Sequence, residues 1–467
     1  MMEIDDSLYS RQRCVLGEDA MQKMSESKVF LHGLGGLGIE IAKNLVLGGI
    51  QELTIQDNTV CSYADLGTQF FVRKADIEAG KTRAEASLPH LADLNPYVRV
   101  VLDANDLTTI RSPLTDATNQ ALLRSLWKFG QSEARSVQCL ILTHCSLHAA
   151  TLLNLFCRQH NIRFIYTDVY GVLGNLFCDF GPDFLITDPD GEPAKEFFIG
   201  HIEKRGSGEL LVKVYGDRRH HLETGHVVQF REVCGMTELN GRTFAVCVLS
   251  PSELLIEVET DELSQYTGGG IGLQIIQPQR RSFKTLLEQL RQPTIVTTDL
   301  SRPDEGILLH HVFLTLMKFK HEEKRLPKPW CESDYKLFST KFEELRQVSP
   351  HDLGSPECLT FVRRLALVSQ GQVPALCAFF GGVAAQEAMK ALTGHFSPFN
   401  QWLYMHCEPV IPRNLESQTL CLNGSRYDLL TVCIGPLCLQ RLRHLSAFLV
   451  SYRRQSTIVL VKSSYLA

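Results

Sequence analysis

The chain has 467 residues, more than one hydrophobic core usually serves, so we expect several domains. Its 44% hydrophobic and 21% charged residues are typical of a globular protein, and no apolar run reaches the roughly 20 residues that cross a bilayer. A net charge of -5 gives no general attraction to nucleic acid or to an anionic membrane, so we expect neither as a partner. The 15 cysteines include no CxxC pair, which favours reduced thiols in a cytoplasmic protein that could also be nuclear.

The first third of the chain alternates between short apolar runs and amphipathic stretches. VFLHG, ELTIQD, VRVVL, CLILTH and IRFIYTDV are predicted strands. Helical spacing of apolar residues follows the first of them, and further helices are predicted over 84–94 and 147–161. This alternation predicts an α/β fold with a parallel, doubly wound sheet.

The pattern changes after Phe180. LLVKVYG, HVVQFREV, RTFAVCVL and LLIEVET alternate with period two between turn residues, which predicts an inserted small β domain. From about Ser282 the period becomes helical again, and we expect a helical bundle there. A last α/β stretch contains the helix CAFFGGVAAQEAMKALTGHF and the strand QWLYMHC.

The glycine-rich sequence GLGGLG follows the first predicted strand and opens a helix. An acidic residue, Asp57, ends the next strand about 20 residues later. Glycines permit a tight turn and a close approach of the backbone, and helix N-terminal amides attract phosphate. The motif is compatible with a dinucleotide site, a mononucleotide site or a vestigial one. Its glycines are Gly33, Gly35, Gly36 and Gly38.

Longer motifs around this loop carry a resemblance to a known family. DDSLYSRQRCVLGEDAMQKM, DLGTQFF, RAEASLPHLADLNPYV and NLFCDFG, then YTGGGI, FFGGVAAQEAMKALTGHFSPFNQWLY and SRYD, are similar to the first half of ubiquitin-activating enzymes. The resemblance covers about residues 3–450 and implies two Rossmann-like, ThiF-type domains, of which only the second adenylates. It implies an inactive adenylation domain (1–178, returning at 356–412), a first catalytic-cysteine half-domain (179–278), a four-helix bundle (279–355) and the start of an active adenylation domain (425–467).

In that family the carboxyl terminus of ubiquitin or a ubiquitin-like protein is activated with ATP and Mg²⁺ and transferred to a cysteine as a thioester. The resemblance implies that a conjugating enzyme binds only through domains that this chain lacks. Compared with the active domain's pattern, the charged set here is depleted, so we expect no productive binding of ATP and Mg²⁺. The corresponding positions hold Asp57, Thr59, Asp65, Gly67, Thr68, Arg83 and Cys145.

The depleted set leaves the glycine loop and Asp57 as remnants. We interpret the loop as a tight strand-to-helix turn and Asp57 as a solvated carboxylate at a strand end. Arg11 is the exception, because the resemblance implies that this arginine reaches the ATP phosphates of the partner domain. A guanidinium supplied from outside a nucleotide site can grip phosphate in a planar, bidentate way. A surface ion pair is the alternative for Arg11.

Two further groups could be mistaken for sites. Cys438 in GPLCLQRL has a proline nearby, but its position in a predicted helix favours ordinary packing over catalysis. His220, His221 and His226 lie among turn residues without a matching set of carboxylates, so we expect exposed polar residues and no metal.

After one further predicted strand, RHLSAFLV, the chain ends without a second glycine loop, because residues 451–467 contain no glycine. We therefore expect a chain that is inactive alone, with poor packing from about residue 425 onward. Two other functions stay open: a scaffold subunit that pairs with a separate active chain, and an NAD-dependent oxidoreductase built on GLGGLG and Asp57.

Overall fold

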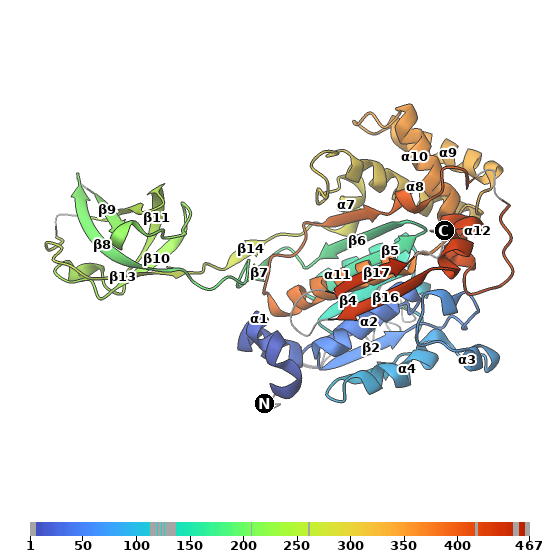
Figure 1. The fold of residues 1–467 in the computed structure, drawn as a ribbon, viewed down its shortest axis with the longest axis horizontal. Helices are drawn as coiled ribbons and strands as arrows, with labels where there is room; N and C mark the ends of the chain where they lie inside the picture. Colours follow the sequence, from blue (N-terminus) through green and yellow to red (C-terminus); the bar gives the residue numbers. More distant parts are fainter. Residues whose placement is uncertain are drawn as a thin grey trace.

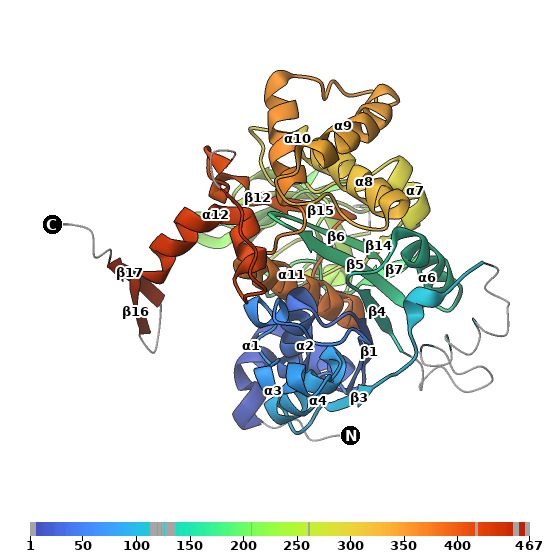
Figure 2. The same ribbon diagram turned by 90° about the vertical axis from the view of Figure 1, so that its right-hand side faces the viewer.

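The computed structural model describes residues 6–112, 119, 123, 126, 137–206, 208–259, 262–415, 419–451 and 457–462. Figure 1 shows a sheet domain flanked by helices, and a small β-barrel that stands away from it on a two-stranded stalk. A group of helices covers one side of the sheet domain (Figure 2). None of the helices in the described ranges is both long and apolar enough to cross a membrane.

The main sheet has the strand order β15-β6-β5-β4-β1-β2-β3 within the described residues. Strands β1 to β5 pair in parallel, whereas β6 and β15 pair antiparallel at one edge. The predicted α/β class and doubly wound order are confirmed; β15 is the predicted strand QWLYMHC, and β6 is an addition to the predicted strands. The strands are β1 (Lys28–His32), β2 (Glu52–Gln56), β3 (Arg99–Leu102), β4 (Cys139–Leu142), β5 (Arg163–Tyr170), β6 (Leu173–Asp179) and β15 (Trp402–His406).

Both faces of this sheet are buried, so its central strands alternate between two cores. In β1, Val29 and Leu31 belong to one core and Phe30 to the other, as the period of two in a strand requires. Helices α2, α4 and α11 cover the first face, and α1 packs on α11. Helix α6 and the bundle cover the second face. The helices are α1 (Asp6–Ser25), α2 (Gly36–Gly48), α3 (Lys74–Glu78), α4 (Arg83–Leu94), α6 (Leu147–Gln159) and α11 (Pro374–Thr393).

The inserted β domain is a closed barrel with its own apolar core. Two antiparallel strands, β7 (Phe184–Ile186) and β14 (Gln279–Arg281), form its stalk. His220 is only 2% exposed and is held between Ser250 O and the Leu222 amide, so its predicted exposure is wrong. His221 is exposed and His226 half-buried. The barrel strands are β8 (Glu196–Arg205), β9 (Glu209–Val214), β10 (Val227–Arg231), β11 (Thr243–Ser250), β12 (Glu253–Glu257) and β13 (Ile271–Ile275).

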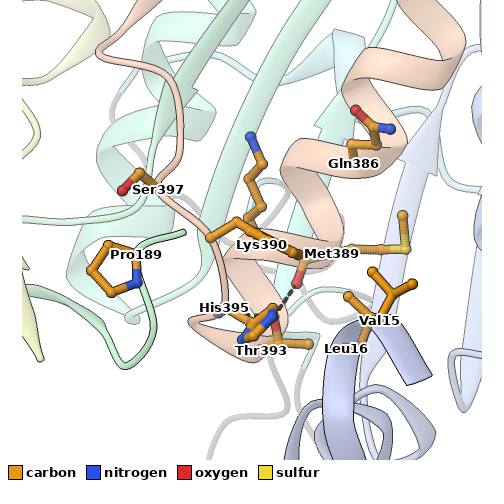
Figure 3. A pocket seen from close by; sticks show the side chains of 10 residues that line it. Val15, Leu16, Pro189, Gln386, Met389, Lys390, Thr393, His395 and Ser397 are labelled. Carbon is orange, nitrogen blue, oxygen red and sulfur yellow. Dashed lines mark hydrogen bonds between the residues drawn. The ribbon is translucent and has the colours of Figure 1, made fainter. Parts of the chain in front are cut away.

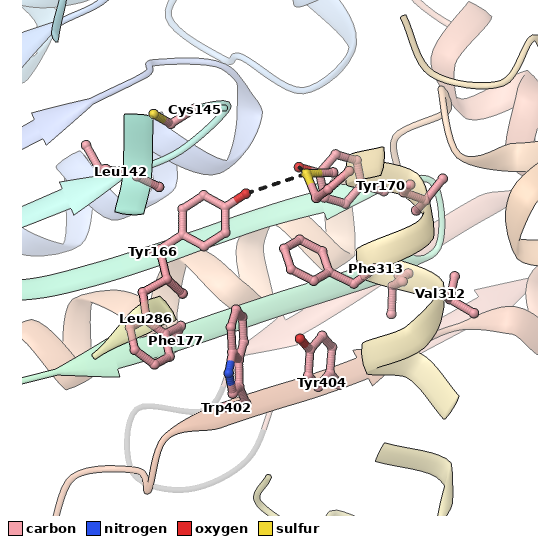
Figure 4. Packing of buried hydrophobic residues seen from close by; sticks show 14 of the residues in the cluster. Leu142, Cys145, Tyr166, Tyr170, Phe177, Leu286, Val312, Phe313, Trp402 and Tyr404 are labelled. Atoms are coloured by element: carbon pink, nitrogen blue, oxygen red, sulfur yellow. Dashed lines mark hydrogen bonds between the residues drawn. The ribbon is translucent and has the colours of Figure 1, made fainter. Parts of the chain in front are cut away.

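The helical bundle packs on the β15 edge of the sheet through aromatic side chains (Figure 4). Phe313 lies 5.6 Å from Trp402 and 6.2 Å from Tyr166, measured between ring centroids. This contact joins the bundle to the sheet domain in one continuous core. The bundle helices are α7 (Leu286–Arg291), α8 (Glu305–Glu323), α9 (Glu332–Gln347) and α10 (Pro356–Val368).

The C-terminal region begins with α12 (Asp428–Arg443), whose first half joins the core of the sheet domain. Val432 and Cys433 are buried, and Trp330 Nε1 donates a hydrogen bond to Val432 O at 3.0 Å. The expectation of poor packing from residue 425 is therefore wrong for this half-helix. Beyond the break at Gly435, the helix is largely exposed. The one predicted strand there is in fact two, the antiparallel pair β16 (Ser446–Ser451) and β17 (Thr457–Lys462).

Candidate functional site: the glycine loop and its cavity

A cavity of about 220 Å³ lies at the carboxyl ends of β1 and β4. These strands are neighbours from which the chain continues in opposite directions across the sheet, and ligands of open α/β sheets bind at such a switch point. The segment 369–372, Lys320 of α8 and Leu429 of α12 complete the wall. The sequence-predicted glycine loop therefore borders a real hollow, but a smaller one than the 300 Å³ or so at which ligand pockets begin.

The loop makes the tight turn that its glycines predict. Gly33 has a φ of +86°, which disfavours any side chain, and a Cβ there would lie 2.2 Å from Thr143 Oγ1. A Cβ on Gly38 would lie 1.9 Å from Gly33 O, because the first turn of α2 is packed directly on the loop. The helix N-terminus is thus fixed against the end of β1.

Side chains of the protein itself crowd the other two glycines. A Cβ at Gly36 would lie 2.4 Å from Thr68 Cβ, and one at Gly35 would lie 2.9 Å from His144 Nε2. Thr68 Oγ1 donates to Gln372 Oε1 at 2.8 Å, so it is held over the loop. The loop face that would approach a phosphate is partly occupied by these side chains.

Asp57 is buried, with 5% exposure, so its interpretation as a solvated carboxylate is wrong. Its Oδ2 accepts the Leu34 amide of the glycine loop at 2.7 Å, and its Oδ1 accepts the Thr59 amide at 2.9 Å. Burial, the largest influence, would raise the pKa of Asp57, but these hydrogen bonds and Arg83 lower it below its ordinary value. The carboxylate is therefore ionised and committed to holding the loop.

Arg83, at the start of α4, is the cation nearest the loop. Its Nη2 lies 2.7 Å from Asp65 Oδ1, and its Nη1 lies 3.7 Å from Asp57 Oδ2. Asp65 also accepts the amide and hydroxyl of Ser62 at 2.8 and 2.9 Å. The positive charge of Arg83 is thus already balanced by two buried carboxylates.

These residues do not fit ATP with Mg²⁺. The cavity lining holds one carboxylate and two cations, and two further carboxylates lie directly beside it; because Arg83 is already paired with two of these carboxylates, Lys320 is the one unpaired cation that this lining offers to a triphosphate. In the described ranges, no cluster of three or more His, Cys, Asp or Glu side chains is placed to hold a metal. Cys145, at the predicted metal-ligand position, is fully buried, and burial raises its pKa to about 12. The carboxylates are Asp57, Asp65 and Asp168, and the cations are Arg83 and Lys320.

The start of α12 closes the cavity from above the loop. A Cβ on Gly67 would lie 2.4 Å from Arg426 O, and the Gln372 amide donates to Leu429 O at 3.0 Å. Cys433 packs against Gly371, where a Cβ would lie 2.4 Å from its sulfur. Sequence reasoning missed this wall; the glycines at 67 and 371 were the available signal, since each marks a close approach of another segment.

Arg11 lies elsewhere, on the exposed side of α1, and does not line this cavity. No hydrogen bond or ion pair joins its side chain to another residue of the described part of the chain. Two residues on, Arg13 pairs with Glu18. The structure thus separates Arg11 from the glycine loop and from Asp57, and leaves its side chain exposed.

A second hollow of about 480 Å³ lies between α1 and the end of α11 (Figure 3). Val15 and Met389 give it an apolar side. Its two basic side chains already have acidic partners, Lys390 with Glu387 at 2.5 Å and His395 with Asp188 at 3.5 Å. This hollow has no nucleophile beside an unpaired base, so we assign no catalytic role to it.

Comparisons with known proteins agree with this architecture. The ThiF family model matches residues 9–408. The chain is 40% identical over 456 residues to ubiquitin-like modifier-activating enzyme 6 of Homo sapiens. Its segments IDDSLYSRQR and AMQKM also predict a resemblance to this member of the family. It is 36% identical over 453 residues to enzyme 1 of Oryctolagus cuniculus and 34% identical over 433 residues to enzyme 7 of Homo sapiens. These alignments cover 91 to 96% of this chain but only 40 to 41% of each relative.

Proposed function

Since this chain belongs to the ThiF family, we propose that it serves the ATP-dependent activation of ubiquitin or a ubiquitin-like protein as the non-catalytic half of an adenylating pair. Its similarity to three modifier-activating enzymes supports the reaction class. We further propose that it acts in the cytoplasm, and in the nucleus where the pathway operates there. The modifier is its partner, and a conjugating enzyme joins through other domains of the assembly.

One observation carries the non-catalytic assignment: Arg83 is neutralised by Asp57 and Asp65. Adenylation joins a carboxylate to a phosphate, so two anions must meet and unpaired cations must stabilise them. Here the cation beside the loop is engaged, and a phosphate would have to displace two buried carboxylates to reach it. We infer that ATP binds in the partner domain and that the ThiF domain of this chain has a structural role in the pair.

Arg11 is the residue that we propose to act across the pair. It is exposed on α1, and a guanidinium there could contact the phosphates of ATP bound to the partner. The matched control is Arg13, which lies on the same helix and pairs with Glu18.

ATP–pyrophosphate exchange tests both parts. The purified chain with ubiquitin, ATP and Mg²⁺ is expected to give no exchange above background, and robust exchange would refute the assignment. When the chain is combined with an active adenylating domain, Arg11→Ala should lower exchange by about tenfold or more. Arg13→Ala should leave it nearly unchanged; equal effects of the two substitutions would remove the special role of Arg11.

A second candidate is a scaffold subunit that pairs with a separate adenylating chain. Val15 on α1 and Phe379 on α11 are 63% and 42% exposed, and exposed apolar residues on two packed helices favour association. Light scattering tests this function, because a scaffold should form a stoichiometric complex with the active chain, and a chain that stays monomeric in that mixture would count against it.

The oxidoreductase alternative has less support. Both Asp57 oxygens accept backbone amides, which leaves this carboxylate poorly placed for a ribose, and the cavity of about 220 Å³ is small for a dinucleotide. Calorimetric titration with NAD should therefore give no measurable heat of binding.

A further inference from the structure

A groove of about 740 Å³ lies between α6 of the sheet domain and helices α8 and α9 of the bundle. It is separate from the glycine loop, although Lys320 borders both hollows. Its floor is apolar, and four of the five floor residues are only partly buried. These floor residues are Leu147, Leu290, Leu314, Met317 and Leu345.

The rim of the groove is cationic. None of the residues that line it is a carboxylate, although the chain as a whole has a net charge of -5. Lys320 has no ion-pair partner in the described ranges, and Lys324 Nζ donates to a backbone oxygen, that of His321, at 2.7 Å. Lys318 pairs with Glu344, which does not line the groove. The rim residues are His148, Lys318, Lys320, His321 and Lys324.

The start of α6 adds to this positive potential. Ser146, the N-cap, lines the groove, so the N-terminal end of this 13-residue helix opens onto it. Helix N-termini carry a partial positive charge that favours anions within the first turn. Three lysines, two histidines and a helix end therefore surround an apolar floor.

We propose that this groove binds an acidic amphipathic helix of a partner protein. The leucine floor matches the apolar face of such a helix, and the lysines match acidic residues along its edges. A small, wholly polar anion would leave the leucines uncovered, and an uncharged apolar segment would leave the lysines unpaired. Charge complementarity together with the apolar floor thus specifies the partner's chemistry.

The probe is a fluorescein-labelled peptide of about 18 residues, with leucines at i, i+3, i+4 and i+7 and glutamates elsewhere. Fluorescence anisotropy with the full chain should show saturable binding that weakens as ionic strength rises from about 0.05 to 0.5 M. The double substitution Lys320→Glu with Lys324→Glu should weaken binding by about tenfold or more, since it reverses two rim charges. Leu345→Gln should also weaken it, because it places an amide in the floor.

The matched control is Lys336→Glu on α9, an exposed lysine that does not line the groove. It changes the net charge as each rim substitution does, and it should leave binding within about twofold. Thermal melts of all variants check that each is folded.

Two results would overturn the proposal. In one, a peptide of the same composition with scattered leucines binds equally well, so that general charge attraction explains the signal. In the other, dodecanoate binds to the groove while the helical peptide does not, which would make it a site for a small amphiphile.

Discussion

The glycine-loop cavity and the groove between α6 and α8 share one wall residue, Lys320, and yet they differ in how their charges are balanced. In the cavity, Arg83 is held by Asp57 and Asp65, and the space beside the loop is partly filled by Thr68 and His144. In the groove, no carboxylate lines the wall and all four leucines of the floor stay partly exposed.

The difference shows that a binding motif does not by itself make a binding site. The loop keeps the glycines of a nucleotide fold, but its cation is neutralised within the protein, so the arrangement contributes to stability. The groove matches no short motif, but two of its lysines, Lys320 and Lys324, have no ion-pair partner in the described ranges. For this chain, we therefore expect unbalanced positive charge to be a better sign of a binding site than a cluster of glycines.

The largest expected effect comes from removing the cation that neutralises the carboxylates beside the cavity. Arg83→Met should lower the free energy of unfolding by about 3 kcal/mol, because it leaves Asp57 and Asp65 buried without a cation. Lys320→Met, in the groove, should change it by about 0.5 kcal/mol or less, since no partner charge is stranded. Urea unfolding followed by circular dichroism measures both.

A double variant tests the reason for that loss. Arg83→Met combined with Asp65→Asn removes the closest ion pair, while the amide oxygen of asparagine can still accept from Ser62, so this variant should recover part of the stability lost by Arg83→Met alone. If the double variant were less stable than Arg83→Met, the loss would come from packing of the guanidinium rather than from an unpaired carboxylate.

Much of the fold was predictable, because its signals are local. The runs at β1 and β4 are apolar on both faces, as buried parallel strands require, and glycine at the first turn marks the strand-to-helix junction. Period-two alternation likewise identified β9 to β12 of the barrel. The antiparallel strand β6 was missed, because Gly174 and Asn175 interrupt its apolar run and its residues show no alternation.

The site was predictable in its residues but not in its pairing. The sequence placed Asp57 at the end of a strand, but its burial depends on the Leu34 amide and on Arg83, which lies 26 positions later in the chain. The packing of α12 over the cavity depends on contacts between residues hundreds of positions apart, such as Gly67 with Arg426. Periodicity and motifs carry no information about such contacts.

The second prediction concerns the stability contributed by His310, a buried histidine beside the groove. Burial lowers the pKa of His310 from 6.5 to about 4; its Nδ1 lies 2.7 Å from Tyr404 Oη, and its Nε2 lies 3.4 Å from Leu290 O. As pH falls from 6.5 to about 4, the unfolded chain takes up a proton that the folded chain refuses. Stability from this residue is thus complete above pH 6.5 and lost toward pH 4, by about 3 kcal/mol in all.

His310→Gln should flatten this pH dependence, measured as the urea midpoint at several pH values. His321→Gln, an exposed histidine on the same helix, should leave the slope as it is. Equal slopes for the wild type and His310→Gln would mean that His310 binds its proton at the same pH in the folded protein as in the unfolded chain.

The smallest expected effect comes from replacing two glycines that differ in the space available for a Cβ atom. Gly38→Ala should lower the free energy of unfolding by about 1 to 3 kcal/mol, because its Cβ would lie 1.9 Å from Gly33 O. Gly382→Ala should raise it by about 0.5 to 1 kcal/mol, because no atom lies within 4 Å and alanine is favoured inside α11. Thermal unfolding separates the two signs. If Gly38→Ala were tolerated as well as Gly382→Ala, the loop would be able to move away from α2 and make room for a phosphate. The contrast between a closed cavity and an open groove would then be wrong.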